Sequence, residues 1–134
     1  MAKRPASDPQ FEISFYENVL QKTPNFIEAL MCLGDLYTKE GFYEKGLRVD
    51  ERLAKLRPDD ATVFYNLACS YSLMNEVDAA NRAVQRAIEL GYDDLDYLQK
   101  DPDLINLLGS ETFQAYFKDV RSKRARKSRR QEAA

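Results

Sequence analysis

Residues 61–90 decide the fold of this chain, and their sequence is ATVFYNLACSYSLMNEVDAANRAVQRAIEL. Phe64, Leu67 and Tyr71 recur at spacings of three and four residues, which places them on one face of a helix. Asn75 then stands where a residue that tolerates a left-handed backbone ends one helix and permits a tight turn. A second stretch with helical spacing follows it. The segment is therefore predicted to form two helices that pack as a hairpin.

The same pattern occurs 34 residues earlier, in residues 27–56, whose sequence is IEALMCLGDLYTKEGFYEKGLRVDERLAKL. Apolar residues, small residues and the turn residue recur at equal spacing in the two stretches. The matching pairs are Leu30 and Phe64, Leu33-Gly34 and Leu67-Ala68, Tyr37 and Tyr71, Gly41 and Asn75, Gly46 and Ala80, Leu56 and Leu90, and Pro24 and Pro58. An ordinary amphipathic bundle explains helical spacing but not this period, so a helical repeat array is favoured.

These residues resemble the tetratricopeptide repeat (TPR). In the first helix of a repeat, that family has a large residue at position four, Leu-Gly at positions seven and eight, and Tyr at position eleven. Further along the repeat it has Ala at position twenty, an aromatic residue at twenty-four, Ala at twenty-seven and Pro at thirty-two. The two units, counted from Ile27 and Ala61, depart from it at Asp50, Leu53 and Tyr92. The first two departures indicate unusual packing of the second helix of unit one. Tyr92, in place of Pro, indicates that the regular array stops near residue 91.

The resemblance implies an all-α fold, a right-handed superhelical array of antiparallel helix hairpins with about two full repeats. The segment after Leu90 is similar to the capping segment that follows the last repeat in bacterial TPR proteins, where short helices cover the exposed apolar end. Upstream, the apolar residues between Phe11 and Leu20 form either the second helix of an incomplete repeat or a plain capping helix. The expected organisation is a flexible N-terminus (1–8), a TPR domain (9–120) with full repeats at about 27–60 and 61–92 and capping helices at 9–23 and 93–120, and a basic, disordered tail (121–134).

Charge is distributed unevenly along the chain. Eight of the 20 basic residues but only two of the 22 acidic residues lie in residues 118–134, so this end carries +6 and the rest −8. No large apolar residue follows Val120, so the tail is predicted not to fold on its own. The basic residues of the predicted tail are Arg121, Lys123, Arg124, Arg126, Lys127, Arg129 and Arg130.

Residues suited to catalysis or metal binding are scarce. The chain has no His, its five glycines do not form a phosphate loop, and Cys32 and Cys69 are too far apart in sequence for a metal motif. The two cysteines are either small apolar fillers or, if close in space, a redox pair. Acidic clusters are expected at helix starts as caps. We therefore expect no enzyme, no catalytic residues, no cofactor and no metal, and, without a leader or a long apolar run, a cytoplasmic protein.

The family resemblance implies that positions two, five, nine and twelve of each first helix face a concave groove. These residues, with the neighbouring Asn66, are Glu28, Met31, Asp35, Thr38, Thr62, Tyr65, Asn66, Cys69 and Ser72. They form either an ordinary solvated face or a groove for a peptide or helix of another protein. Glu28 and Asp35 favour a neutral or basic ligand. Some TPR domains bind the C-terminal carboxylate of a chaperone through Lys, Arg and Asn at fixed groove positions. Such a clamp is disfavoured here, because only Asn66 matches those residues.

The leading hypothesis is a non-catalytic interaction module or scaffold. The alternative is binding of nucleic acid through the basic tail, which has no aromatic residue for base stacking and follows an acidic body that repels phosphates. The tail could equally dock on an acidic protein or on another copy of the chain. The sequence leaves both a monomer and a homodimer open.

Overall fold

Helices begin and end where the sequence places capping and turn residues. A computed structural model describes residues 8–133 of the protein, and these residues form helices, turns and short connections only. The first helix, α1 (Pro9–Lys22), starts behind Asp8, whose carboxylate accepts a hydrogen bond from the backbone N–H of Gln10. The flexible N-terminus predicted for residues 1–8 lies, apart from Asp8, outside the described residues.

Two helix hairpins follow α1, as the 34-residue period predicts. The first consists of α2 (Ile27–Lys39) and α3 (Tyr43–Leu56), and the second of α4 (Ala61–Leu73) and α5 (Val77–Glu89). The turn residues take the predicted left-handed conformation, with φ of 82° at Gly41 and 58° at Asn75. In each hairpin the second helix therefore starts directly after the turn and can fold back on the first helix.

A periodic hydrogen bond places α1 in the same array. The hydroxyl of Tyr71 donates to Glu51, and that of Tyr37 donates to Glu17, with O–O distances of 3.0 Å and 2.7 Å. Glu17 and Glu51 are 34 residues apart, as are the two tyrosines. The contact between α1 and α2 is thus equivalent to the contact between α3 and α4. Helix α1 therefore takes the place of the second helix of a preceding unit.

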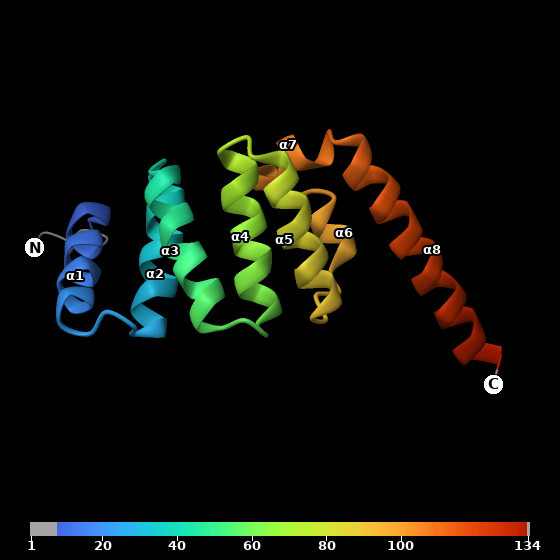
Figure 1. Ribbon diagram of the computed structural model, residues 1–134, viewed down its shortest axis with the longest axis horizontal. Coiled ribbons are helices and arrows are strands. Elements are labelled where there is room, and N and C mark those ends of the chain that lie inside the picture. Colours follow the sequence, from blue (N-terminus) through green and yellow to red (C-terminus); the bar gives the residue numbers. More distant parts are fainter. Residues whose placement is uncertain (1–7, 134) are drawn as a thin grey trace, which may run out of the picture.

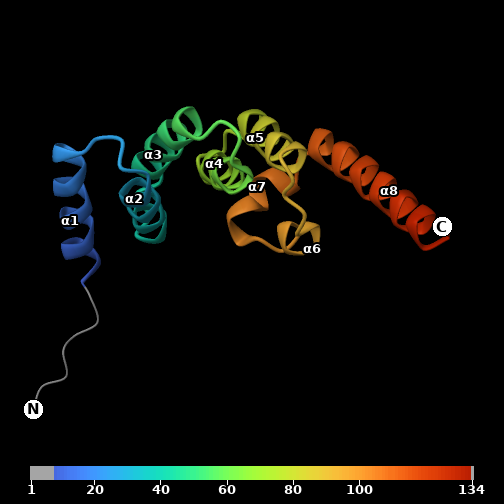
Figure 2. The same cartoon turned by 90° about the horizontal axis from the view of Figure 1, so that it is seen from below.

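The helices form two layers. In Figure 2, α2 and α4 lie on one side and α3 and α5 on the other. Close approach within the first hairpin requires Gly46, because a Cβ atom there would lie 2.9 Å from the Thr38 Oγ1 and 3.6 Å from the Gly34 carbonyl oxygen. Small residues at the crossing point thus set the spacing of the two layers.

A capping segment covers the end of α4 and α5. It comprises α6 (Leu95–Leu98), the 3₁₀ turn η1 (Pro102–Leu104), α7 (Ile105–Leu108) and the start of α8 (Glu111–Ala133). Figure 2 shows α6 and α7 on the side of the molecule formed by α2 and α4. Ser72 joins α7 to α4, because its hydroxyl accepts from the backbone N–H of Leu107 while its carbonyl accepts from Asn106.

The main core lies beneath this cap. It joins α4 and α5 to the capping helices, and Leu98, Leu104 and Leu107 within it have no exposed surface. Two smaller clusters, around Leu33 and Leu30, connect α1, α2 and α3 to each other and to α4. Most of the apolar burial is therefore concentrated at the C-terminal half of the array.

The structure differs from the sequence-based expectation at the basic tail. Residues 121–133, predicted as disordered, continue α8 without a break to Ala133. After Ser110 the chain contains no Gly or Pro and is rich in Arg, Lys, Ala and Gln, which all favour helix. Packing of Phe113 and Phe117 holds the first turns of α8, so the costly nucleation step is already complete. No helix within residues 8–133 has the length and apolarity needed to cross a membrane.

We expect Leu107→Ala to lower the free energy of unfolding by about 2–5 kcal/mol, because it opens a cavity in the fully buried core. Ile105→Ala in the same short helix is the matched control, since Ile105 is 66% exposed, and its effect should stay below about 1 kcal/mol. Urea unfolding followed by circular dichroism measures both. Equal effects would show that the cap does not contribute to the core.

Candidate functional site

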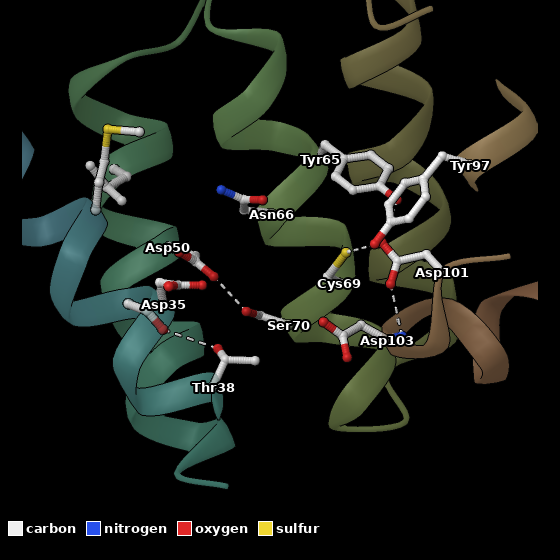
Figure 3. A pocket seen from close by; sticks show the side chains of 13 residues that line it. Asp35, Thr38, Asp50, Tyr65, Asn66, Cys69, Ser70, Tyr97, Asp101 and Asp103 are labelled. Carbon is white, nitrogen blue, oxygen red and sulfur yellow. Dashed lines mark hydrogen bonds between the residues drawn. The ribbon is translucent and has the colours of Figure 1, made fainter. Parts of the chain in front are cut away.

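A polar pocket of about 290 Å³ opens between α2, α4 and the capping segment (Figure 3). Its walls come from four parts of the chain, namely α2, α3, α4 and the capping segment. The lining residues are Met31, Gly34, Asp35, Thr38, Asp50, Leu53, Tyr65, Asn66, Cys69, Ser70, Tyr97, Asp101 and Asp103. Four of them are aspartates and none is basic, so the pocket is acidic.

The back of the pocket is formed by Asp50, the residue that departs from the repeat pattern. Its carboxylate reaches from α3 towards α4, where it accepts a hydrogen bond from the Ser70 hydroxyl (Figure 3). Gly34 leaves room for it, because a Cβ atom at that position would lie 3.1 Å from the Asp50 Oδ1. A polar pair thus replaces the bulky side chain usual at this position and joins the two units.

Burial raises the pKa of Asp50 from its ordinary value of 3.8 to about 6. The hydrogen bond from Ser70 opposes this shift, whereas the nearby charge of Asp35 adds to it. Asp50 therefore changes its protonation in a mildly acidic range, and the negative charge of the pocket rises as the pH increases through that range.

The opposite wall is centred on Asp101, which is 5% exposed. The Tyr65 hydroxyl and the Cys69 thiol both donate to its Oδ2, and its Oδ1 accepts from the backbone N–H of Asp103. Burial, followed by the Asp101 charge, raises the pKa of both the Cys69 thiol and the Asp103 carboxyl. Tyr65 also stacks on Tyr92, with ring centroids 4.3 Å apart and planes at 11°. These contacts hold the capping segment against α4.

Six of the nine predicted groove residues line this pocket, namely Met31, Asp35, Thr38, Tyr65, Asn66 and Cys69. Glu28 and Thr62 are exposed but lie outside it. The structure corrects the expected exposure of Tyr65, Cys69 and Ser72, which are 7%, 8% and 0% exposed. The reason is the capping segment, which lies over the part of α4 that would otherwise face solvent.

Seven lining residues of the pocket are not among the predicted groove residues: Gly34, Asp50, Leu53, Ser70, Tyr97, Asp101 and Asp103. Asp50 carried a signal, because it stands at a position where the family pattern has bulk. Asp101 belongs to the acidic clusters expected to cap helices, and it does cap η1. Nothing in the spacing of Tyr97 or Asp103 indicates that they lie beside α4.

The candidate metal ligands are few. Cys69, Asp101 and Asp103 have one potential ligand atom each, all within 4.8 Å of one another. The Cys69 thiol donates to the Asp101 carboxylate, which also accepts from the Tyr65 hydroxyl and from the backbone N–H of Asp103, and a structural zinc site takes four ligands. Cys32 is exposed, Cys69 is buried, and both are free thiols.

The predicted basic residues lie along α8. Arg121 donates to the Gln99 side chain and pairs with Asp96, while Arg124 donates to the carbonyl oxygens of Tyr92 and Asp93. The remaining basic residues, Lys123, Arg126, Lys127, Arg129 and Arg130, are exposed.

Solved structures with the same arrangement of helices were found by comparison. A crystal structure of MamA, a tetratricopeptide-repeat protein, is similar over 66% of this chain and 52% of the MamA chain, with 31% identity and a TM-score of 0.61. MamA from Desulfovibrio magneticus RS-1 is similar over 88% of this chain and 68% of its own, with 24% identity and a TM-score of 0.70. This chain has the tetratricopeptide-repeat fold.

A curated relative of this TPR chain is a chloroplastic protein from Arabidopsis thaliana, with 38% identity over 85 residues. The match includes 61% of this chain but 25% of the Arabidopsis protein. The chain thus spans a quarter of this relative and about half of the first MamA chain. No protein-family model matches the sequence.

We expect the stability of the protein to increase as the pH falls from about 6 to about 4, through Asp50. In that range the folded protein keeps a proton on Asp50 that the unfolded chain has released, so protons favour the folded state. Asp50→Asn should therefore raise the free energy of unfolding at pH 7.5 by about 1–3 kcal/mol and change it little near pH 4. Urea titrations at both pH values test this. The same gain in Asp78→Asn, at an exposed position of α5, would contradict it.

Proposed function

We propose that this protein is a non-catalytic interaction scaffold that binds a peptide or helix of another protein in the acidic pocket. The observation that carries the proposal is the composition of the pocket wall, with four aspartates and no basic residue. The TPR fold supports protein partners in general. The pocket lies on the side of α2 and α4, where the sequence predicts the groove.

A Lys or Arg side chain of the partner is the group that fits this wall. Asp35 provides an accessible carboxylate, since its side chain is 63% exposed and, within residues 8–133, pairs only with Lys39 on its own helix. Asp50 and Asp103 lie deeper and add negative charge behind it. A guanidinium group donates in a plane to several oxygens at once, which suits such a set of carboxylates.

Other lining residues suit the backbone and apolar parts of a peptide. The exposed amide of Asn66 can donate to a peptide carbonyl and accept from a peptide N–H. Met31 and Tyr97 are 39% and 48% exposed at opposite sides of the pocket, where they offer apolar contact. A basic residue followed by an apolar one would thus contact both kinds of surface.

The proposal also covers the oligomeric state, the absence of catalysis and the location of the protein. The walls of the pocket come from one chain, so binding does not require a homodimer. The hydrogen bonds of Asp50 and Asp101 support a structural role for these acids, which accords with a scaffold without catalysis. A cytoplasmic location and a bacterial type are inferred from the sequence alone.

A second candidate function is binding of nucleic acid or an acidic partner through the basic residues of α8. The observation that favours it is the continuation of α8 well beyond the body (Figure 1), which exposes these side chains along one rigid helix. Its charge is opposite to that of the pocket, so the two candidate surfaces require different partners.

The pocket is tested with Asp35→Asn/Asn66→Ala, two accessible lining residues that contribute little to the core. Partners captured from cell extract are identified by mass spectrometry, and peptides from them are titrated against both proteins. We expect the variant to bind these peptides about tenfold more weakly, because an ion pair and backbone hydrogen bonds are lost.

Asn18→Ala/Asp78→Asn is the matched control, with the same change of charge at exposed positions of α1 and α5. It should bind like the wild type. Unchanged affinity in the pocket variant, or a preference for acidic over basic peptides, would argue against the pocket as the binding site.

A further inference from the structure

A shallow channel follows one face of α8 and consists of two adjoining hollows. The first, of about 470 Å³, is lined by Gln99, Leu108, Phe113, Gln114, Phe117, Lys118, Arg121 and Ser122. The second, of about 430 Å³, is lined by Arg121, Ser122, Ala125, Arg126 and Arg129. Because Arg121 and Ser122 belong to both, the hollows are continuous, and we call them together the α8 channel.

The α8 channel changes in character along its length. At the end nearest the body the floor is apolar: Leu108 is half-buried, whereas the stacked rings of Phe113 and Phe117, with centroids 5.3 Å apart, are 1% and 5% exposed, so Leu108 rather than the rings is accessible. Towards the C-terminal end the floor is replaced by basic side chains: Lys118, Arg121, Arg126 and Arg129. No carboxylate is among the residues that line either hollow.

Most of these cations form no ion pair with the residues that the structure describes. Within residues 8–133, Arg121 pairs with Asp96 at 3.4 Å, whereas Lys118, Arg126 and Arg129 form no ion pair. Positive charge is therefore available for a ligand directly beside an apolar surface.

The channel is also fixed in place before any ligand binds. The Arg121 guanidinium donates to Gln99 at 2.6 Å and lies 5.7 Å from the Phe117 ring centroid, and the Gln114 amide donates to the Leu108 carbonyl at 2.8 Å. The contacts of Arg121 with Gln99 and of Gln114 with Leu108 join α8 to the cap, whereas the Arg121–Phe117 contact lies within α8. The helix itself is thus positioned before a ligand binds, and only its exposed side chains have to be ordered.

We propose that the α8 channel is a second docking surface, which binds an acidic amphipathic helix of a partner protein. Its apolar side chains would pack in the hollow beside Leu108, and its carboxylates would pair with the cations further along α8. From Phe113 to Arg129 the channel spans about 24 Å, which matches a helix of about 16 residues. The inference rests on the second candidate function, binding of an acidic partner through α8, and not on binding in the acidic pocket.

Charge complementarity alone would also suit nucleic acid or an anionic membrane, but other features favour a protein. The chain has no aromatic residue after Phe117 on which bases could stack, and residues 1–117 carry −8, which repels phosphates. It has no large apolar residue after Val120 that could insert into a bilayer. Only a ligand with apolar side chains makes use of the hollow at Leu108.

The test compares two double variants that change the net charge of the full-length protein equally. Lys118→Glu/Ser122→Glu places acids in the channel, whereas Lys123→Glu/Ser128→Glu places them at exposed positions of α8 outside it. The probe is a labelled peptide of about 16 residues, with Leu and Phe towards one end of a helix and Glu along the rest. Circular dichroism confirms that both variants remain folded.

We expect the wild type to bind this peptide, the channel variant to bind it at least about tenfold more weakly, and the control variant to lose less than about threefold, at about 0.15 M salt. Equal losses in the two variants would overturn the proposal. So would equal binding of a peptide with Ser in place of Leu and Phe. Tighter binding of a duplex DNA of about 20 base pairs, or of phosphatidylserine-containing vesicles, would assign α8 to those ligands instead.

Discussion

In a repeat array each hairpin has an apolar side that the next hairpin covers, and here the side presented by α4 and α5 is covered by short helices. Leu98, Leu104 and Leu107 provide this cover and are fully buried. The rest of the pocket depends on the direction in which the capping segment folds back on α4. Because it passes over α4 on the side shared with α2, it brings Asp101 and Tyr97 to the concave face and closes one end of it. Stability and the shape of the pocket thus arise from the same packing.

Repetition extends beyond the two full hairpins. Tyr37 bonds to Glu17 as Tyr71 bonds to Glu51, so the contact between successive units is the same at both junctions. The exception is Asp50, where a buried carboxylate and Ser70 take the place of apolar packing. A polar contact at this position weakens the junction at neutral pH but leaves an ionisable group beside the pocket. The departure from the repeat pattern is thus located at the candidate site.

Opposite charges are kept apart in this small chain. The acidic pocket lies between α2, α4 and the capping segment, whereas α8 extends away from the body at the C-terminal end of the array and carries the basic side chains (Figure 1). The near-zero net charge of −2 therefore results from two surfaces of opposite sign. Such separation favours two different partners, since each surface attracts ligands that the other repels.

Features that depend on nearby residues were determined by the sequence itself: the helical spacing, the 34-residue period, the turns at Gly41 and Asn75, and the capping of α1 by Asp8. They depend on side-chain spacing and backbone hydrogen bonds within a few residues. The continuation of α8 is equally local, because it follows from helix propensity and from an anchored start rather than from apolar burial. Only the tertiary structure decided that Asp101 meets Tyr65, 36 residues away, and thereby which groove residues remain exposed. That contact depends on how the cap folds back, which no spacing along the chain encodes.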